Sequence, residues 1–177
     1  MCWKQYKKLP QTLDTKVSDD KVEVIKICEI DKYGKLYGFF HSYFEYELNK
    51  EYKTEMNIKH EVVNLPLSDE SYNYYEGNNG FHSYSKEKCK LVVTKEATYG
   101  DIDGVQYISI SMLSPHNTEI SGYSSHYSSQ INRVAIVKGY IPKGSTYLEN
   151  ENGEIISEGI VLTEILNLEI CLGNQKD

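Results

Sequence analysis

Apolar and polar side chains alternate along several short stretches of this chain, as they do in half-buried β-strands. Another stretch is dense in tyrosine and phenylalanine, which favour strands because their rings pack well on a pleated surface. The most apolar stretch begins at the single arginine, Arg133. The pattern therefore predicts strands at Val22–Ile30, Leu36–Leu48, Val105–Leu113, Arg133–Ile141, Thr146–Glu149 and Ile160–Ile165.

Turn-forming residues separate these stretches. Asp31–Gly34 and Pro142–Gly144 each combine a turn-favouring polar or Pro residue with glycine. Asn152–Gly153 is the clearest local signal, because Asn-Gly readily adopts the positive φ angles of a type I′ hairpin. We therefore expect antiparallel hairpins and a C-terminal β-meander.

The remaining segments lack a clear period. Residues 1–20 predict an irregular N-terminal arm, in which Trp3 is the residue able to dock on the body. Residues 53–79 predict mostly loop, and residues 114–130 a long polar loop. Ser83 or Ser85 could cap a short helix that ends at Lys90.

These elements together predict one β-rich domain over residues 21–177. The fold class is all-β, or α+β dominated by β, with a twisted antiparallel sheet folded against itself in a sandwich-like way and one or two short helices. A chain of 177 residues suits a single core, and 40% hydrophobic residues is a globular composition.

Charge and composition exclude some partners. A net charge of −7 opposes binding to nucleic acid polymers and to anionic membranes, because both need clustered Lys and Arg. No apolar run approaches the roughly 20 residues of a membrane span, and the start shows no signal peptide, so we expect a cytoplasmic protein. The four cysteines stand singly without metal-ligand spacing, so we expect buried thiols, no metal and no cofactor.

Candidate chemistry comes from histidine, tyrosine and the single arginine. Histidine can act as an acid, a base or a hydrogen-bonding group near neutral pH, and two copies of Phe-His-Ser-Tyr contain a histidine each. Tyrosine rings stack on nucleobases, and arginine binds phosphate bidentately. The candidate ligand-binding residues are His41, Tyr43, His82, Tyr84, Tyr123, Tyr127 and Arg133. The alternative is structural: tyrosines fill half-exposed strand positions, histidines pack among them, and Arg133 begins a strand on the surface.

The C-terminal motifs resemble those of a known group. Ile141–Tyr147 (IPKGSTY) followed by Asn152–Ser157 (NGEIIS) is similar to a set of small uncharacterised proteins from bacteriophages and gut bacteria, and Tyr37–Tyr52 and Gly80–Tyr84 look like its earlier motifs. The resemblance implies a β-rich, phage-type domain. A more distant likeness is to ADP-ribosyltransferases, which carry an arginine early in the chain and a Ser-Thr-Ser strand after it. In this chain the order is reversed, since Arg133 follows the strand that contains Ser109 and Ser111.

These observations favour a non-enzymatic, phage-type protein that sequesters a small nucleotide-like ligand, such as a host immune signal, in the bacterial cytoplasm. One alternative is an enzyme that acts on a nucleotide, for instance of ADP-ribosyltransferase-like type. Another is a protein-binding inhibitor or structural accessory protein. A homo-oligomer is a further expectation, because the free edges of sheets need cover.

Overall fold

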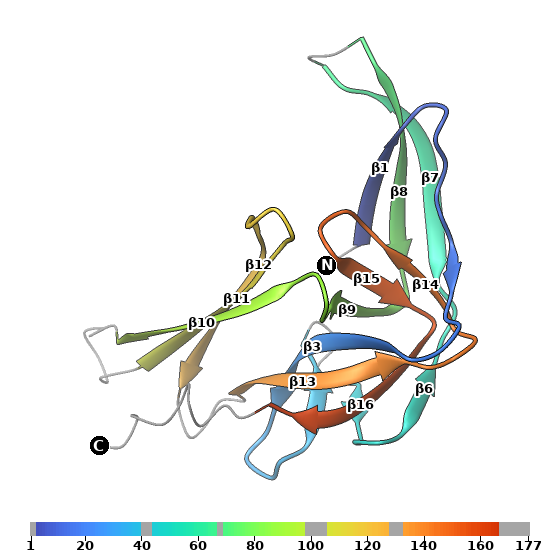
Figure 1. The fold of residues 1–177 in the computed structure, drawn as a ribbon. Coiled ribbons are helices and arrows are strands. Elements are labelled where there is room, and N and C mark those ends of the chain that lie inside the picture. Colours follow the sequence, from blue (N-terminus) through green and yellow to red (C-terminus); the bar gives the residue numbers. More distant parts are fainter. Residues whose placement is uncertain (1–2, 40–43, 67–68, 98–105, 128–132, 167–177) are drawn as a thin grey trace.

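The computed structural model describes residues 3–39, 44–66, 69–97, 106–127 and 133–166. Sixteen strands occur there, all paired antiparallel, and the described residues contain no helix. The fold is therefore all-β (Figure 1). The strands are β1 (Trp3–Lys8), β2 (Lys16–Val17), β3 (Val22–Ile30), β4 (Leu36–Gly38), β5 (Glu45–Tyr46), β6 (Glu51–Lys53), β7 (Asn57–Asn64), β8 (Ser71–Asn78), β9 (Phe81–Ser85), β10 (Lys90–Ala97), β11 (Gln106–Leu113), β12 (Glu119–Tyr127), β13 (Arg133–Ile141), β14 (Thr146–Glu149), β15 (Glu154–Ser157) and β16 (Gly159–Ile165).

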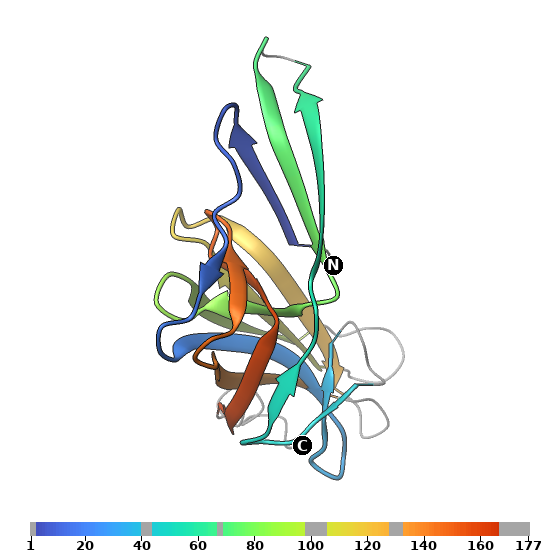
Figure 2. The ribbon, with the colours of Figure 1, turned by 90° about the vertical axis from the view of Figure 1, so that its right-hand side faces the viewer.

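The strands form three sheets. The central sheet has the order β2-β14-β15-β9-β3-β13-β16-β6, with β4 added beside β3 and β5 beside β4. The projecting sheet has the order β1-β8-β7 and stands away from the body in both ribbon views (Figures 1 and 2). The side sheet, β10-β11-β12, extends to the left in Figure 1.

Strands β3 and β13 lie at the centre because both of their faces are apolar. Val24 and Cys28 of β3 join one buried cluster, with Ala135 and Val137 of β13. The alternate residues of the two strands join a second cluster, which packs against Ile110 and Met112 of the side sheet. Strands covered on both sides have nearly continuous apolar sequences. The alternation in Val22–Ile30 predicted a half-buried strand, but both faces of β3 are covered.

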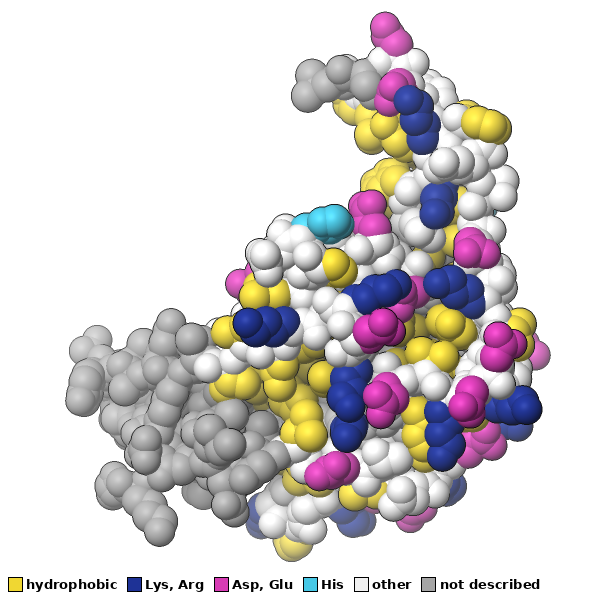
Figure 3. Space-filling view, in the orientation of Figure 1, with side chains coloured by type: hydrophobic (Ala, Val, Ile, Leu, Met, Phe, Trp, Pro, Cys, Tyr) yellow, Lys and Arg dark blue, Asp and Glu magenta, His cyan; other side chains and the backbone are white. Residues whose placement is uncertain are grey.

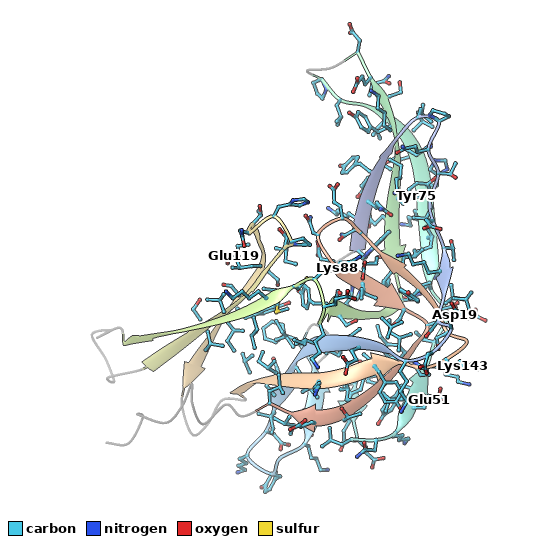
Figure 4. The ribbon with its side chains drawn as sticks, in the orientation of Figure 1. Asp19, Glu51, Tyr75, Lys88, Glu119 and Lys143 are labelled. Carbon is cyan, nitrogen blue, oxygen red and sulfur yellow. The ribbon has the colours of Figure 1, made fainter. Side chains whose placement is uncertain are left out.

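A third cluster fastens the projecting sheet to the body. Trp3 and Tyr75 pack there against Leu148 and Ile156 of the central sheet. The indole Nε1 of Trp3 donates a hydrogen bond to the carbonyl of Glu154 at 2.9 Å. Tyr75, which Figure 4 labels part-way along the projecting sheet, therefore links the middle of β8 to this cluster.

Several sequence predictions are corrected by these strands. Residues 1–20 are not an irregular arm, because β1 pairs with β8 and β2 with β14, although Trp3 does dock as expected. The predicted loops at 53–79 and 114–130 contain all of β7, β8 and β12. These strands are polar on exposed faces, so they lack the apolar alternation that marks a strand in sequence.

The helix predicted from Ser83 or Ser85 to Lys90 is also wrong. Ser83 and Ser85 belong to β9, and a short turn follows, in which the amide of Cys89 donates to the carbonyl of Ser85 at 2.9 Å. The Ser85 hydroxyl does accept a hydrogen bond from the amide of Lys88, so it caps this single turn. Pairing of β9 with both β15 and β3 outweighs the local capping signal.

The turns agree better with the sequence. Asp31–Gly34 and Pro142–Ser145 are both closed by a backbone hydrogen bond, and Gly34 and Gly144 have positive φ. The hairpin at Asn152–Gly153 has positive φ only at the glycine, so it is not the expected type I′ turn. The loop between β14 and β15 is longer than the two residues of a type I′ turn. Asn150 holds this loop, because its Oδ1 accepts hydrogen bonds from the amides of Asn152 and Glu154.

Gly139 supports a prediction about the central sheet. The register between β13 and β16 shifts beside it, and a Cβ at this position would collide with the carbonyl oxygen of Val161. We expect Gly139→Ala to lower the free energy of unfolding by about 2–3 kcal/mol, because backbone must move to relieve the clash. Urea unfolding would measure it. Gly122→Ala is the control, since the added methyl meets only the movable carboxylate of Glu119, and an equal loss in both variants would contradict the assignment.

Candidate functional site

The central sheet divides at one edge of β3. Strand β9 pairs with β3 at Val24 and Ile25, whereas β4 pairs with it from Cys28 onward. Between these two pairings β9 and β4 separate, and Lys26 and Ile27 lie in the gap. A cavity of about 580 Å³ opens there, which we call the fork pocket.

Aromatic rings from both faces of the sheet line the fork pocket. Phe39 and Tyr123 meet edge to face with ring centroids 4.4 Å apart, and the hydroxyls of Tyr84 and Tyr123 lie 3.4 Å apart. On the other side, the rings of Phe44 and Tyr46 lie 4.8 Å apart. The aromatic lining residues are Phe39, Phe44, Tyr46, Phe81, Tyr84 and Tyr123.

A buried amine lies in this aromatic surround. Lys26 is 8% exposed, and its Nζ donates a hydrogen bond to the carbonyl of His82 at 2.7 Å. The same Nζ lies 5.6 Å from the centroid of the Tyr46 ring, within reach of a cation–π attraction. Burial lowers the pKa of Lys26 from its usual 10.5, because the ammonium is deprived of water.

No described carboxylate forms an ion pair with Lys26, so its charge is not compensated within this part of the chain. A buried ammonium is costly unless an anion or several acceptors surround it. Lysines without such a partner are rare in interiors and gather at functional sites. Lys26 is therefore the residue that most clearly marks the pocket as a site.

Polar groups complete the rim of the pocket. Lys53 ends β6, Asn57 begins β7 and Glu55 lies between these two strands. Asn79 comes from the bend between β8 and β9. Asn79 has a φ of 64°, and the next residue, Gly80, leaves room for Ile156 that a Cβ would occupy. This bend carries the chain from the projecting sheet into the central sheet beside the pocket.

Burial favours the protonated form of two tyrosine hydroxyls of the pocket, those of Tyr46 and Tyr84. The pKa values of Tyr46 and Tyr84 are raised above the usual value, chiefly because burial disfavours the phenolate. Both groups can therefore donate as well as accept hydrogen bonds at neutral pH.

Three of the residues proposed from sequence line the fork pocket: His82, Tyr84 and Tyr123. The backbones of Tyr127 and Arg133 lie in β12 and β13, but their side chains are outside the described part. His41 and Tyr43 lie outside the described residues, so one copy of the Phe-His-Ser-Tyr pair is not placed.

Sequence reasoning missed Lys26. The signal was its position in the alternation of the strand. Lys26 shares a face with Val22, Val24 and Cys28, whereas Glu23 and Glu29 lie on the other face. A lysine on the apolar face of a strand predicts either strain or a site. Two cysteine predictions are confirmed, since Cys28 and Cys89 are buried free thiols and burial raises the pKa of each to about 11. Cys2 and Cys171 lie outside the described residues.

A second cavity of about 600 Å³ lies between β2 and the β9–β10 turn. It contains lysines, but Lys86 and Lys88 are ion-paired with Glu23 and Glu149. On the face in Figure 3, basic and acidic side chains are interspersed over the body in the same way. Lys86 and Lys88 are each paired with a carboxylate and are partly exposed, so they point to a solvated surface more than to a site.

Other kinds of site are not found in the described part of the chain. It contains no group of three His, Cys, Asp or Glu side chains able to hold a metal ion. Nor does it contain a helix of the length and hydropathy that would cross a membrane. Fold and pocket together define an all-β protein with an aromatic cavity built around a buried lysine.

Comparison with family models, curated proteins and solved structures gave no match to this chain.

Proposed function

We propose that this protein is a binding protein that holds a small, anionic, nucleotide-like ligand in the fork pocket. The observation that carries the proposal is the uncompensated amine of Lys26 inside a cavity lined by aromatic rings. An anionic group of the ligand would supply the missing negative charge. Lys53 at the rim is already paired with Glu51 at 3.8 Å and is largely exposed, so the proposal rests on Lys26 alone.

The aromatic lining suits the planar part of such a ligand. A nucleobase stacked on a tyrosine or phenylalanine ring gains roughly 1–3 kcal/mol. Asn57 and Asn79 carry amides, which can both donate to and accept from the edge of a base. The volume of about 580 Å³ lies within the range of small-molecule sites.

The resemblance of Ile141–Tyr147 and Asn152–Ser157 to phage-type proteins supports a biological setting for this binding. In that setting the protein would sequester a signalling nucleotide of the bacterial host without altering it chemically. An enzyme would instead alter the ligand, so the recovered mass separates the two.

The test is a thermal-shift screen of the full chain against mononucleotides, cyclic dinucleotides and NAD-derived compounds. A ligand at a hundredfold excess over its dissociation constant stabilises the folded state by about 2.7 kcal/mol. For a chain of this size that raises Tm by about 5–10 °C. Mass spectrometry then shows whether the ligand is recovered intact.

Three results would decide between the proposals. A shift with intact ligand supports sequestration, and a shift with altered ligand supports an enzyme. No shift across the panel would overturn the nucleotide proposal.

A further inference from the structure

The outer edge of the projecting sheet is unoccupied among the described residues. Strand β7 pairs only with β8, and nearly every residue of β7 is exposed. Two apolar side chains stand out, since Ile58 is 36% and Val62 is 59% exposed. In Figure 2, β7 forms the side of the projecting sheet opposite β1.

An open edge of this length can pair with another strand, because its outward amides and carbonyls have no partners. Most proteins block such edges with lysine, proline or a bulge. Strand β7 has one lysine, Lys59, and no proline until Pro66 beyond its end. Its register with β8 runs from Asn57 to Asn64 without a bulge.

The sequence of β7 is complementary to itself about His60. Lys59 and Glu61 flank that residue, with Ile58 and Val62 one step further out. When two copies pair antiparallel with their His60 residues opposite each other, Lys59 of each faces Glu61 of the other. Ile58 of each then faces Val62 of the other. Opposite charges and apolar pairs are the cross-strand neighbours that stabilise a sheet.

The other registers are worse. A slip of one residue would place Lys59 opposite Val62 or His60 and remove both charge pairs. A slip of two residues would place Lys59 opposite its own copy, or Glu61 opposite its own copy, and like charges directly opposite each other destabilise a pair. Among the registers within two residues of this one, the charge pattern therefore favours His60 opposite His60.

We propose that two copies of this chain associate through β7, by antiparallel pairing about a twofold axis at His60, to form a continuous sheet β1-β8-β7 with its symmetry mate. A twofold arrangement suits an edge that complements itself. Lys59 then discourages foreign strands while accepting a second copy. This association does not depend on what the fork pocket binds.

The test is the mass of the full chain in solution by sedimentation velocity. Wild type should sediment as a dimer. Glu61→Lys should weaken the dimer by about tenfold or more, because it sets Lys59 opposite a lysine at two symmetric places. Within one chain Glu61 lies opposite Tyr74, so this change should leave the projecting sheet folded.

The charge swap Lys59→Glu with Glu61→Lys restores opposite charges across the twofold and should restore the dimer. It is made together with Glu76→Gln, because residue 59 lies opposite Glu76 within the chain and two carboxylates there would repel. Lys143→Glu is the control, since Lys143 is exposed in a turn of the central sheet, away from the projecting sheet (Figure 4). A monomeric wild type at the highest soluble concentration would overturn the proposal. So would a dimer that Glu61→Lys leaves unchanged, or a swapped variant that stays as monomeric as Glu61→Lys.

Discussion

Lys26→Met should weaken binding of an anionic ligand by about a hundredfold, since loss of one partner from a buried charge pair costs about 2–5 kcal/mol. Methionine keeps an unbranched apolar stem that ends at Cε, with sulfur in place of Cδ, and it lacks the amine. The rings that line the fork pocket would remain, so a neutral planar ligand should lose much less affinity. Titration of wild type and variant with the ligand found by thermal shift measures the difference.

The same variant should be more stable than wild type without ligand, by about 1–2 kcal/mol at neutral pH, because an uncompensated buried charge has been removed. The hydrogen bond from Nζ to the carbonyl of His82 is lost, and this offsets part of the gain. Opposite effects on binding and on stability would mark Lys26 as a functional residue, since a purely structural lysine would lose both.

The stability difference should depend on pH with a definite sign. Burial lowers the pKa of Lys26 in the folded protein below its usual 10.5, so between the two values the unfolded chain binds more protons. Wild-type stability from this group therefore rises with pH across that window, and Lys26→Met does not share the rise. The advantage of the variant should be largest below the folded pKa and shrink as the pH approaches 10.5.

Lys143→Met is the matched control, because it makes the same chemical change at an exposed turn. It should change neither binding nor the pH dependence of stability. If Lys26→Met bound the ligand as tightly as this control does, the amine would have no part in recognition. If Lys26→Met were the less stable protein at neutral pH, burial of the amine would not be the dominant cost.

Trp3→Ala should be the most destabilising single change proposed, at about 3–5 kcal/mol. The Trp3 side chain is 1% exposed, packs with Tyr75 and Ile156, and donates a hydrogen bond to Glu154. Its removal leaves a cavity where the projecting sheet meets the central sheet. Urea unfolding measures the loss, and hydrogen exchange should show β1 and β8 losing protection first.

Two variants calibrate this result. Trp3→Phe keeps a ring and loses the hydrogen bond to the Glu154 carbonyl, so it should cost distinctly less than Trp3→Ala. Tyr33→Ala changes a side chain that is 77% exposed and should stay within about 0.5 kcal/mol of wild type. A Trp3→Ala protein as stable as Tyr33→Ala would mean that the third cluster does not hold the projecting sheet.

The central strands could be predicted because the apolar side chains that bury them belong to the strands themselves. Val22–Ile30 and Arg133–Ile141 coincide with β3 and β13, whose alternate residues enter the first two buried clusters. The turns at Asp31–Gly34 and Pro142–Ser145 were equally local, since each needs one glycine at positive φ and one closing hydrogen bond.

The projecting sheet could not be predicted in this way. Residues of β7 are almost all exposed, so its apolar and polar positions carry no period. What makes β7 and β8 strands is the backbone pairing between them and with β1, which lies more than sixty residues earlier than β8. Hydrogen bonds between strands far apart in the sequence satisfy the backbone there, and they impose no apolar period on the side chains.

The candidate site shows the same division. Composition and local pattern pointed to tyrosines and histidines, and His82, Tyr84 and Tyr123 do line one cavity. The sequence by itself determined the antiparallel β class, the central strands and most turns, because period and turn chemistry act between near neighbours. Only the tertiary structure decided that β4 and β9 part beside Lys26, since that gap comes from where distant strands begin and end their pairing with β3.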